Sequence, residues 1–269
     1  MNRGQKVIKI IAIVIAVMLS ITIISSIVAA VSSIFIITNI VENTNNESVV
    51  KNIDVVNQIE DLKINVGASK ICIKEGEKLQ ISTNSKYIVV NEENNKLSIK
   101  ETSHFNFSNP NLETTVYVPK DFKFKQVKIN VGAGELNIAS LIAEKLELSL
   151  GAGTTTIDYV SATSFKAETG AGKLNIKNGL FEKAKLDMGV GNIDIESKIG
   201  DFFDIDAGIG NLNLKLLGNK EEYTLDIDKG VGNVSVDGVD VSNVIGNGSK
   251  HIKIDGGIGN IDINFIKYT

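Results

Sequence analysis

GAGELNIASLIAEKLELSLGAGTTTIDYVSATSFKAETGAGKLNI, residues 132–176, contains the same motif three times. Each copy begins with Gly-Ala-Gly, continues with a polar residue and then alternates apolar and polar positions. The copies start at Gly132, Gly151 and Gly170, so they are evenly spaced. Alternation with a period of two is typical of a strand that buries one face. A strict internal period of this kind indicates a repeat architecture.

Five further copies extend the repeat on both sides. They are GASKICI from Gly67, GVGNIDI from Gly189, GIGNLNL from Gly208, GVGNVSV from Gly230 and GIGNIDI from Gly257. The spacing is constant from Gly132 to Gly208 and then widens before each of the last two copies. Each regular unit holds two period-2 stretches, which predict two short strands and two turns. The sequence therefore predicts an all-β fold, a β-solenoid built as a single-stranded β-helix-like stack of coils of about 19 residues.

Stacking the units in register brings apolar residues into columns that we expect to point inward. The columns after the glycines are Leu136, Thr155, Leu174, Ile193 and Leu212, and Ile138, Ile157, Ile176, Ile195 and Leu214. Those of the second strand are Leu146, Phe165, Ala184 and Phe203, and Leu148, Ala167, Leu186 and Ile205. Small residues offset large neighbours in these columns, which is one way to fill a narrow interior.

The repeated glycines have a backbone explanation. A corner between two strands often requires a positive φ angle, which glycine adopts without steric cost. Gly-x-Gly also occurs in phosphate-binding loops, but a helix follows in those loops, whereas a strand pattern follows every copy here. The segment GNGSK at 246–250 has the wrong residue order for a P-loop, and we interpret it as an ordinary loop.

Composition excludes several classes of function. The net charge is −4 and the lysines are scattered, so we expect no nucleic acid partner. Cys72 is the only cysteine, which excludes an intrachain disulfide and a multi-cysteine metal site. No pattern places His104 or His251 beside Cys72 to activate it. We predict no catalytic, cofactor-binding or metal-binding residue, no cofactor, and a protein that is not an enzyme.

The N-terminal segment predicts a membrane anchor. Residues 10–41 form a run of 32 without a charged side chain, whereas about 20 apolar residues cross a bilayer core. Arg3, Lys6 and Lys9 precede this run, and the next basic residue is Lys51. Because positively charged flanks stay in the cytoplasm, the rest of the chain should lie outside the cell membrane.

These features divide the chain into four parts. They are a cytoplasmic N-terminus at 1–9, a single transmembrane helix at 10–41, a polar stalk at 42–53 and an extracytoplasmic β-solenoid domain at 54–269. The lipid bilayer is then one partner of the chain. The alternative is a cleaved secretory signal, since Val28 and Ala30 form an acceptable cleavage site. That alternative also places the bulk of the chain outside.

The period is less regular near the ends of the domain. A repeat-like unit at 65–73 is followed by strand patterns near 79–81, 86–90 and 96–100, which we expect to begin the same stack. The loop HFNFSNPN at 104–111 holds two aromatic residues, Phe105 and Phe107, which either contact a partner or cap the core. The last unit is partial and is expected to shield the open end of the stack, with Phe265 and Tyr268 as candidates.

Two polar columns flank the glycines. Two residues before the glycine stand Asn65, Asn130, Ser149, Glu168, Asp187, Asp206, Asp228 and Asp255, and three residues after it stand Asn192, Asn211, Asn233 and Asn260. Turn chemistry and stacked hydrogen-bond ladders explain both columns. Weak binding of divalent cations along the carboxylates is the alternative. The last unit is similar to a calcium-binding nonapeptide, but Asp262 comes one residue late, so we predict no calcium site.

A resemblance to a known family rests on three parts of the chain. They are Thr115–Lys120 (TVYVPK), Val127–Ile138 (VKINVGAGELNI) and the glycine units up to Ile263. These resemble the "putative adhesin" domain of unknown function in bacterial membrane-anchored envelope proteins, including those described as LiaG-like. The resemblance covers residues 54–269, implies a β-helix-like fold and brings no agreed activity and no catalytic residue.

Three functional hypotheses follow from the sequence. The favoured one is a non-enzymatic, membrane-anchored surface module of the cell envelope for adhesion, wall interaction or envelope-stress sensing, with a protein or cell-wall partner on the solenoid surface. The second is a scaffold that polymerises end to end through exposed strand edges. The third is a carbohydrate-active enzyme that would use carboxylates such as Asp187 and Asp206. Few aromatic residues are available to stack on sugars, which counts against the third.

Overall fold

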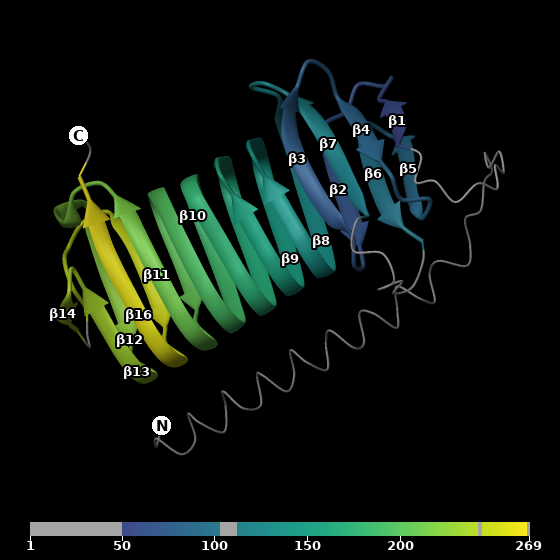
Figure 1. Cartoon of the computed structure of the whole chain (residues 1–269). Helices are drawn as coiled ribbons and strands as arrows, with labels where there is room; N and C mark the ends of the chain where they lie inside the picture. Colours follow the sequence, from purple (N-terminus) through teal and green to yellow (C-terminus); the bar gives the residue numbers. More distant parts are fainter. Residues whose placement is uncertain (1–49, 103–111, 242–243, 268–269) are drawn as a thin grey trace.

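The structure is a computed structural model that describes residues 50–102, 112–241 and 244–267. Over these residues the chain is mostly β-strand, and the strands lie side by side as a long stack (Figure 1). The prediction of an all-β fold is confirmed. Within the same three ranges, no helix is long and apolar enough to span a bilayer.

Several expectations fall on residues outside the described ranges. They are the N-terminus 1–9, the anchor 10–41, the stalk as far as residue 49, the loop 104–111 with Phe105 and Phe107, and Tyr268. The boundary at residue 54 differs from the structure, because strand β1 (Lys51–Asp54) already pairs with β4 (Gln80–Thr83). Polar residues at the end of the expected stalk are therefore part of the sheet.

The remaining elements follow in chain order. They are β2 (Asp61–Val66), β3 (Lys70–Gly76), β5 (Ile88–Glu93), β6 (Lys96–Glu101), β7 (Glu113–Pro119), β8 (Lys123–Ile138), β9 (Leu141–Ile157), β10 (Val160–Asp206), β11 (Ile209–Leu217), the 3-10 turn η1 (Lys220–Glu222), β12 (Tyr223–Asp228), β13 (Val231–Val236), β14 (Val239–Asp240), β15 (Lys250–Asp255) and β16 (Ile258–Ile266).

The central coils lie in parallel register with the period of the sequence. Strands β8 and β9 place Leu136 opposite Thr155 and Ile138 opposite Ile157. The same offset, one repeat long, pairs β9 with β10 and β10 with β11. Every member of the four predicted apolar columns is at most 4% exposed. These columns are the core, and burial of each large aliphatic side chain contributes about 1.5–3 kcal/mol.

Large and small residues alternate inside the stack. Ala184 occupies the column position between Phe165 and Phe203, and all three side chains are buried. The ring of Phe181, from the same coil as Ala184, stacks on Phe165 with 4.4 Å between ring centroids. An alanine at this position leaves space for the neighbouring rings, so the interior stays filled without strain.

The glycine corners take part in the pairing. Ala133 lies opposite Ala152, and Gly134 lies opposite Gly153, so the ladder continues through the turn. This close approach leaves no room for a side chain at the second glycine. A Cβ atom on Gly153 would lie 1.9 Å from the Gly134 carbonyl oxygen, and the φ angle of Gly153 is +143°. Both the contact and the backbone conformation therefore require glycine.

Spatial order differs from sequence order at both ends of the stack. Strands β2 and β3 lie between β8 on one side and β6 and β7 on the other. At the opposite end, β15 lies between β10 and β12, and β16 lies between β11 and β13 (Figure 1). The expectation that the last unit shields the open end is therefore wrong. The outermost coil is formed by β12 and β13, and the C-terminal unit lies inside it.

The longer gaps before Gly230 and Gly257 explain this order. The first extra residues carry the chain past the position next to β10 and β11, so β12 and β13 form one coil farther out. The second set returns the chain to that position, which β15 and β16 fill. Phe265 does not cover an end; its ring contacts that of Tyr223 in the outer coil, with 5.3 Å between centroids. Pairing depends on matching faces in space, which does not require neighbours in sequence.

Antiparallel strands cover parts of both end coils. Strand β4 pairs with β7, and β5 pairs with β6, so the patterns near 79–81 and 86–90 form antiparallel edges, while β6 joins the parallel stack through β2. At the other end β14 pairs with β13, and Ile245 bridges Leu225. Covered edges reduce the backbone groups available to pair with another chain.

Candidate functional surface

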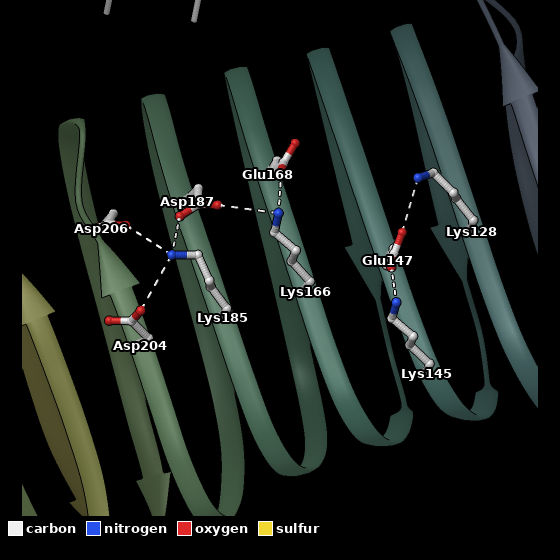
Figure 2. A network of polar contacts seen from close by, with 9 residues as sticks. All are labelled: Lys128, Lys145, Glu147, Lys166, Glu168, Lys185, Asp187, Asp204 and Asp206. Atoms are coloured by element: carbon white, nitrogen blue, oxygen red, sulfur yellow. Dashed lines mark hydrogen bonds and ion pairs between the residues drawn. The ribbon is translucent and has the colours of Figure 1, made fainter. Parts of the chain in front are cut away.

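The outward side chains of the stack form rows because the same position of each coil lies beside its neighbours. On the strands before the glycine corners, one row contains Lys128, Glu147, Lys166, Lys185 and Asp204, and the next contains Glu168, Asp187 and Asp206 (Figure 2). The lysines at 166 and 185 lie two residues before acidic residues of the second row. Period 2 therefore places opposite charges on one face.

Glu147 is the centre of the first group of ion pairs. Its carboxylate accepts from Lys145 Nζ at 2.6 Å and from Lys128 Nζ at 3.1 Å (Figure 2). The hydrogen bond from Lys145 is the main cause that holds the pKa of Glu147 below its ordinary value, and partial burial opposes it. Lys128 belongs to β8 and Glu147 to β9, so this contact joins adjacent coils.

Lys185 is the centre of the second group. Its Nζ lies 3.2 Å from Asp187, 3.4 Å from Asp204 and 3.3 Å from Asp206 (Figure 2). Burial alone would lower the pKa of Lys185, but the bonds to Asp187 and Asp206 outweigh it and raise this pKa. Burial raises the pKa of Asp187. Burial also acts to raise the pKa of Asp206, but the bond from Lys185 outweighs it and lowers this pKa.

These contacts hold the charged side chains in place but contribute little to the stability of the fold. The side chains are 26–51% exposed around Lys185, so water screens the ion pairs and each contributes at most about 1 kcal/mol. Two neighbouring carboxylates whose pKa values are shifted in opposite directions also occur in the acid–base pairs of hydrolases. Here, however, one ammonium group lies between Asp187 and Asp206 on an open strand face.

The two polar columns expected from the sequence exist in the structure. Asp206 lies opposite Asp255, and Asp228 lies opposite Asp255, so the acidic column continues into the outer coil in spatial order. In the second column, Asn211 Nδ2 donates to Asn192 Oδ1 at 3.2 Å. Hydrogen-bonded stacking of this kind supports the explanation by side-chain ladders.

A second polar ladder was not expected from the sequence. Asn213 Nδ2 donates to Asp194 Oδ1 at 2.6 Å, and Ser235 Oγ lies 2.6 Å from Asp262 Oδ1. The lysines that pair with the acidic column were not expected either. Their signal was present in the sequence, because Lys166, Lys185 and Lys253 each precede a column carboxylate by two residues.

No metal centre or reactive thiol emerges from the described residues. The structure groups no three His, Cys, Asp or Glu side chains of the described ranges so that they could hold a metal ion. Cys72 is buried, and its burial raises the pKa of the thiol, which keeps it in the poorly nucleophilic protonated form. His251 is exposed, and His104 lies outside the described residues.

The chain matches one known family and several solved structures. A family described as Toastrack DUF4097 matches residues 59–243. A structure from Clostridium sporogenes ATCC 15579, described as "a putative cell adhesion protein", is 17% identical, with 81% of this chain and 99% of that chain covered and a TM-score of 0.36. A "putative adhesin" from Bacteroides fragilis NCTC 9343 is 15% identical, with coverage of 80% and 96% and a TM-score of 0.44.

A third solved structure, from Parabacteroides distasonis ATCC 8503, is described as a "Putative lipid binding protein". It is 13% identical, with 81% of this chain and 96% of that chain covered and a TM-score of 0.39. No curated protein matches the chain.

Proposed function

Because this chain belongs to the Toastrack DUF4097 family, we propose that it is a non-enzymatic surface module of the cell envelope, anchored in the membrane by residues 10–41. The resemblance found in the sequence is confirmed at the level of the family. The uncharged segment before the domain supports the anchor, and the basic residues ahead of it support an extracytoplasmic domain.

One structural observation carries the proposal. The described domain is a stack of coils in regular parallel register, with a continuous buried core and outward rows of charged and amide side chains. A rod of this kind presents repeated side chains at fixed spacing, which suits recognition of a protein or of a cell-wall polymer. Such a surface is compatible with adhesion, with wall interaction and with stress sensing.

Labelling of intact cells tests the location. Asn247 is exposed and lies in a loop near the outer coil, so Asn247→Cys should react with a membrane-impermeant maleimide on intact cells. Gln5→Cys is the matched control and should react only after lysis. The native Cys72 is buried and should contribute little background. Protection of Asn247→Cys until lysis would overturn the proposed location.

The other hypotheses have weaker support. Antiparallel strands cover parts of both end coils, which disfavours end-to-end assembly. A carbohydrate-active enzyme would use Asp187 and Asp206, which both bind Lys185 on the strand face. Release of sugars from cell-wall glycans by the full-length chain, lost in Asp187→Asn, would replace our proposal by that one.

A further inference from the structure

The residues around the glycine corner change together halfway along the chain. In four coils the six residues read NVGASK (65–70), NVGAGE (130–135), SLGAGT (149–154) and ETGAGK (168–173). In the other four they read DMGVGN (187–192), DAGIGN (206–211), DKGVGN (228–233) and DGGIGN (255–260). Aspartate and asparagine thus replace two mixed positions, and a branched aliphatic residue replaces the alanine between them.

The structure brings the four altered corners side by side. Val190 lies opposite Ile209, Ile209 opposite Ile258, and Ile258 opposite Val231. These four residues are the aliphatic ridge. Val190 is 38% exposed and Val231 is 52% exposed, and the two isoleucines between them are half-buried. The ridge borders a small hollow to which Val231, Ile258 and the corner glycines contribute.

Polar rows lie on both sides of this ridge. The acidic row is Asp187, Asp206, Asp255 and Asp228, and the amide row is Asn192, Asn211, Asn260 and Asn233. We call the ridge and its two rows the corner stripe. The coils that carry the stripe include the C-terminal unit, because β16 lies between β11 and β13.

Folding of the corner does not require the aliphatic ridge. The other four coils carry Ala68, Ala133, Ala152 and Ala171 at the same position. The backbone is alike in both kinds of coil, since the φ angle is +143° at Gly153 and +147° at Gly191. Adjacent aliphatic side chains that are exposed or half-buried keep apolar surface in water, and contiguous surfaces of this kind mark interaction sites.

Charge restricts the occupant of the stripe. The carboxylates on and beside it are Asp187, Asp204, Asp206, Asp226, Asp228 and Asp255, and the lysines are Lys166, Lys185, Lys229 and Lys253. Six carboxylates against four lysines leave negative charge next to the ridge. An anionic lipid surface would be repelled, and so would the same stripe of a second copy. A complementary partner carries positive charge together with apolar side chains.

We propose that the corner stripe binds an extended, cationic amphipathic peptide segment of a partner protein. Apolar side chains of this segment pack on the ridge, and its lysine or arginine side chains pair with the acidic row. Four coils at the usual strand spacing span about 14 Å, the length of about four extended residues. The inference rests on the proposed role as a surface module and names the class of its partner.

Binding of a defined peptide to the full-length chain in a neutral detergent tests this site. The probe is a fluorescent dodecapeptide of alternating lysine and valine, and the comparison peptides alternate glutamate with valine and lysine with serine. We expect fluorescence anisotropy to show binding of the lysine–valine peptide alone, and the binding should weaken as salt is added.

Two variants remove the two parts of the stripe. The first changes Val190, Ile209, Val231 and Ile258 to the alanine found in the other coils, and the second combines Asp228→Asn with Asp255→Asn. Each should weaken binding about tenfold or more, because apolar burial or charge pairing is lost. The matched control, Glu144→Gln with Asp158→Asn, removes two exposed carboxylates outside the stripe and should change binding less than about twofold.

Several results would overturn the proposal. They are failure of the lysine–valine peptide to bind at about 1 mM, equal binding by the stripe variants and the control, and equal binding of the lysine–serine peptide. Self-association of the full-length chain that the alanine variant abolishes would assign the ridge to a second copy instead. Circular dichroism checks that each variant is folded. If the peptide binds but the surface labelling of Asn247→Cys fails, the stripe stands and the proposed location falls.

Discussion

Alanine at Gly210 should disrupt the stack far more than alanine at another glycine with a positive φ angle. At Gly210 the φ angle is +134°, and a Cβ atom would lie 1.8 Å from the Gly191 carbonyl oxygen. Ordinary contact begins near 3.4 Å, so the two backbones would have to separate by about 1.6 Å. Ladder hydrogen bonds of about 2.9 Å do not survive that displacement.

The expected magnitude combines two costs. A non-glycine residue at a φ angle of this kind costs about 1–3 kcal/mol, and loss of about two ladder bonds adds about 1 kcal/mol each. We expect Gly210→Ala to lower the free energy of unfolding by about 3–5 kcal/mol. In a chain of this size the melting temperature should fall by about 10 °C.

Variants at two other glycines distinguish the cost of the backbone conformation from the cost of the contact between coils. Gly238 has a φ angle of +75° and no atom within 4 Å of the place where a Cβ atom would lie, so Gly238→Ala should cost only the conformational strain, about 1 kcal/mol. Gly67 has no positive φ angle, and its nearest contact is Glu101 Oε2 at 3.4 Å, so Gly67→Ala should change stability by less than about 0.5 kcal/mol. Urea unfolding measures all three. A cost at Gly210 no larger than at Gly238 would refute the argument from close coil contact.

Phe203→Ala should lower the free energy of unfolding, measured in urea, by about 3–5 kcal/mol because the ring is fully buried. Phe202 is 36% exposed, so Phe202→Ala should lower it by less than about 1 kcal/mol. Similar losses for the two variants would contradict the inward register. Removal of residues 250–269 should make the amides of 223–236 exchange rapidly, because β12 and β13 lose their parallel partners; protection kept there would contradict the spatial order. Glu147→Gln should lower stability at pH 7 by less than about 1 kcal/mol. Because the pKa of Glu147 is held below its ordinary 4.5, this contribution is present above pH 4.5 and is lost as the pH falls below it, which urea unfolding at several pH values measures; a difference independent of pH would argue against the ion pairs.

The regular part of the fold was predictable because the repeat carries two kinds of information. The spacing of the glycine motifs sets which residues lie opposite each other, as Leu136 and Thr155 do. The period of two sets which side chains are buried, as Ile138 and Ile157 are. Both are local properties of the sequence, and a stack of identical units uses only contacts between adjacent units.

The charged surface was only partly predictable. The sequence indicated columns of Asp187 and Asp206, since these residues keep a fixed distance from the glycines. It did not indicate that Lys185 reaches both carboxylates and Asp204, because side-chain ion pairs depend on rotamers and on the separation of neighbouring coils. The adjacency of the acidic residues Asp206 and Asp255 also required the structure.

By itself, the sequence determined that the chain forms strands with glycine corners, that the repeated units stack in register and that their aliphatic columns are buried, because repetition and alternation act over short distances. Only the tertiary structure decided the order of the coils at the two ends. A coil can pair with any matching face within reach of its linker, so the C-terminal unit lies between β11 and β13. That choice also places Ile258 between Ile209 and Val231, and so assembles the aliphatic ridge from units that are distant in sequence.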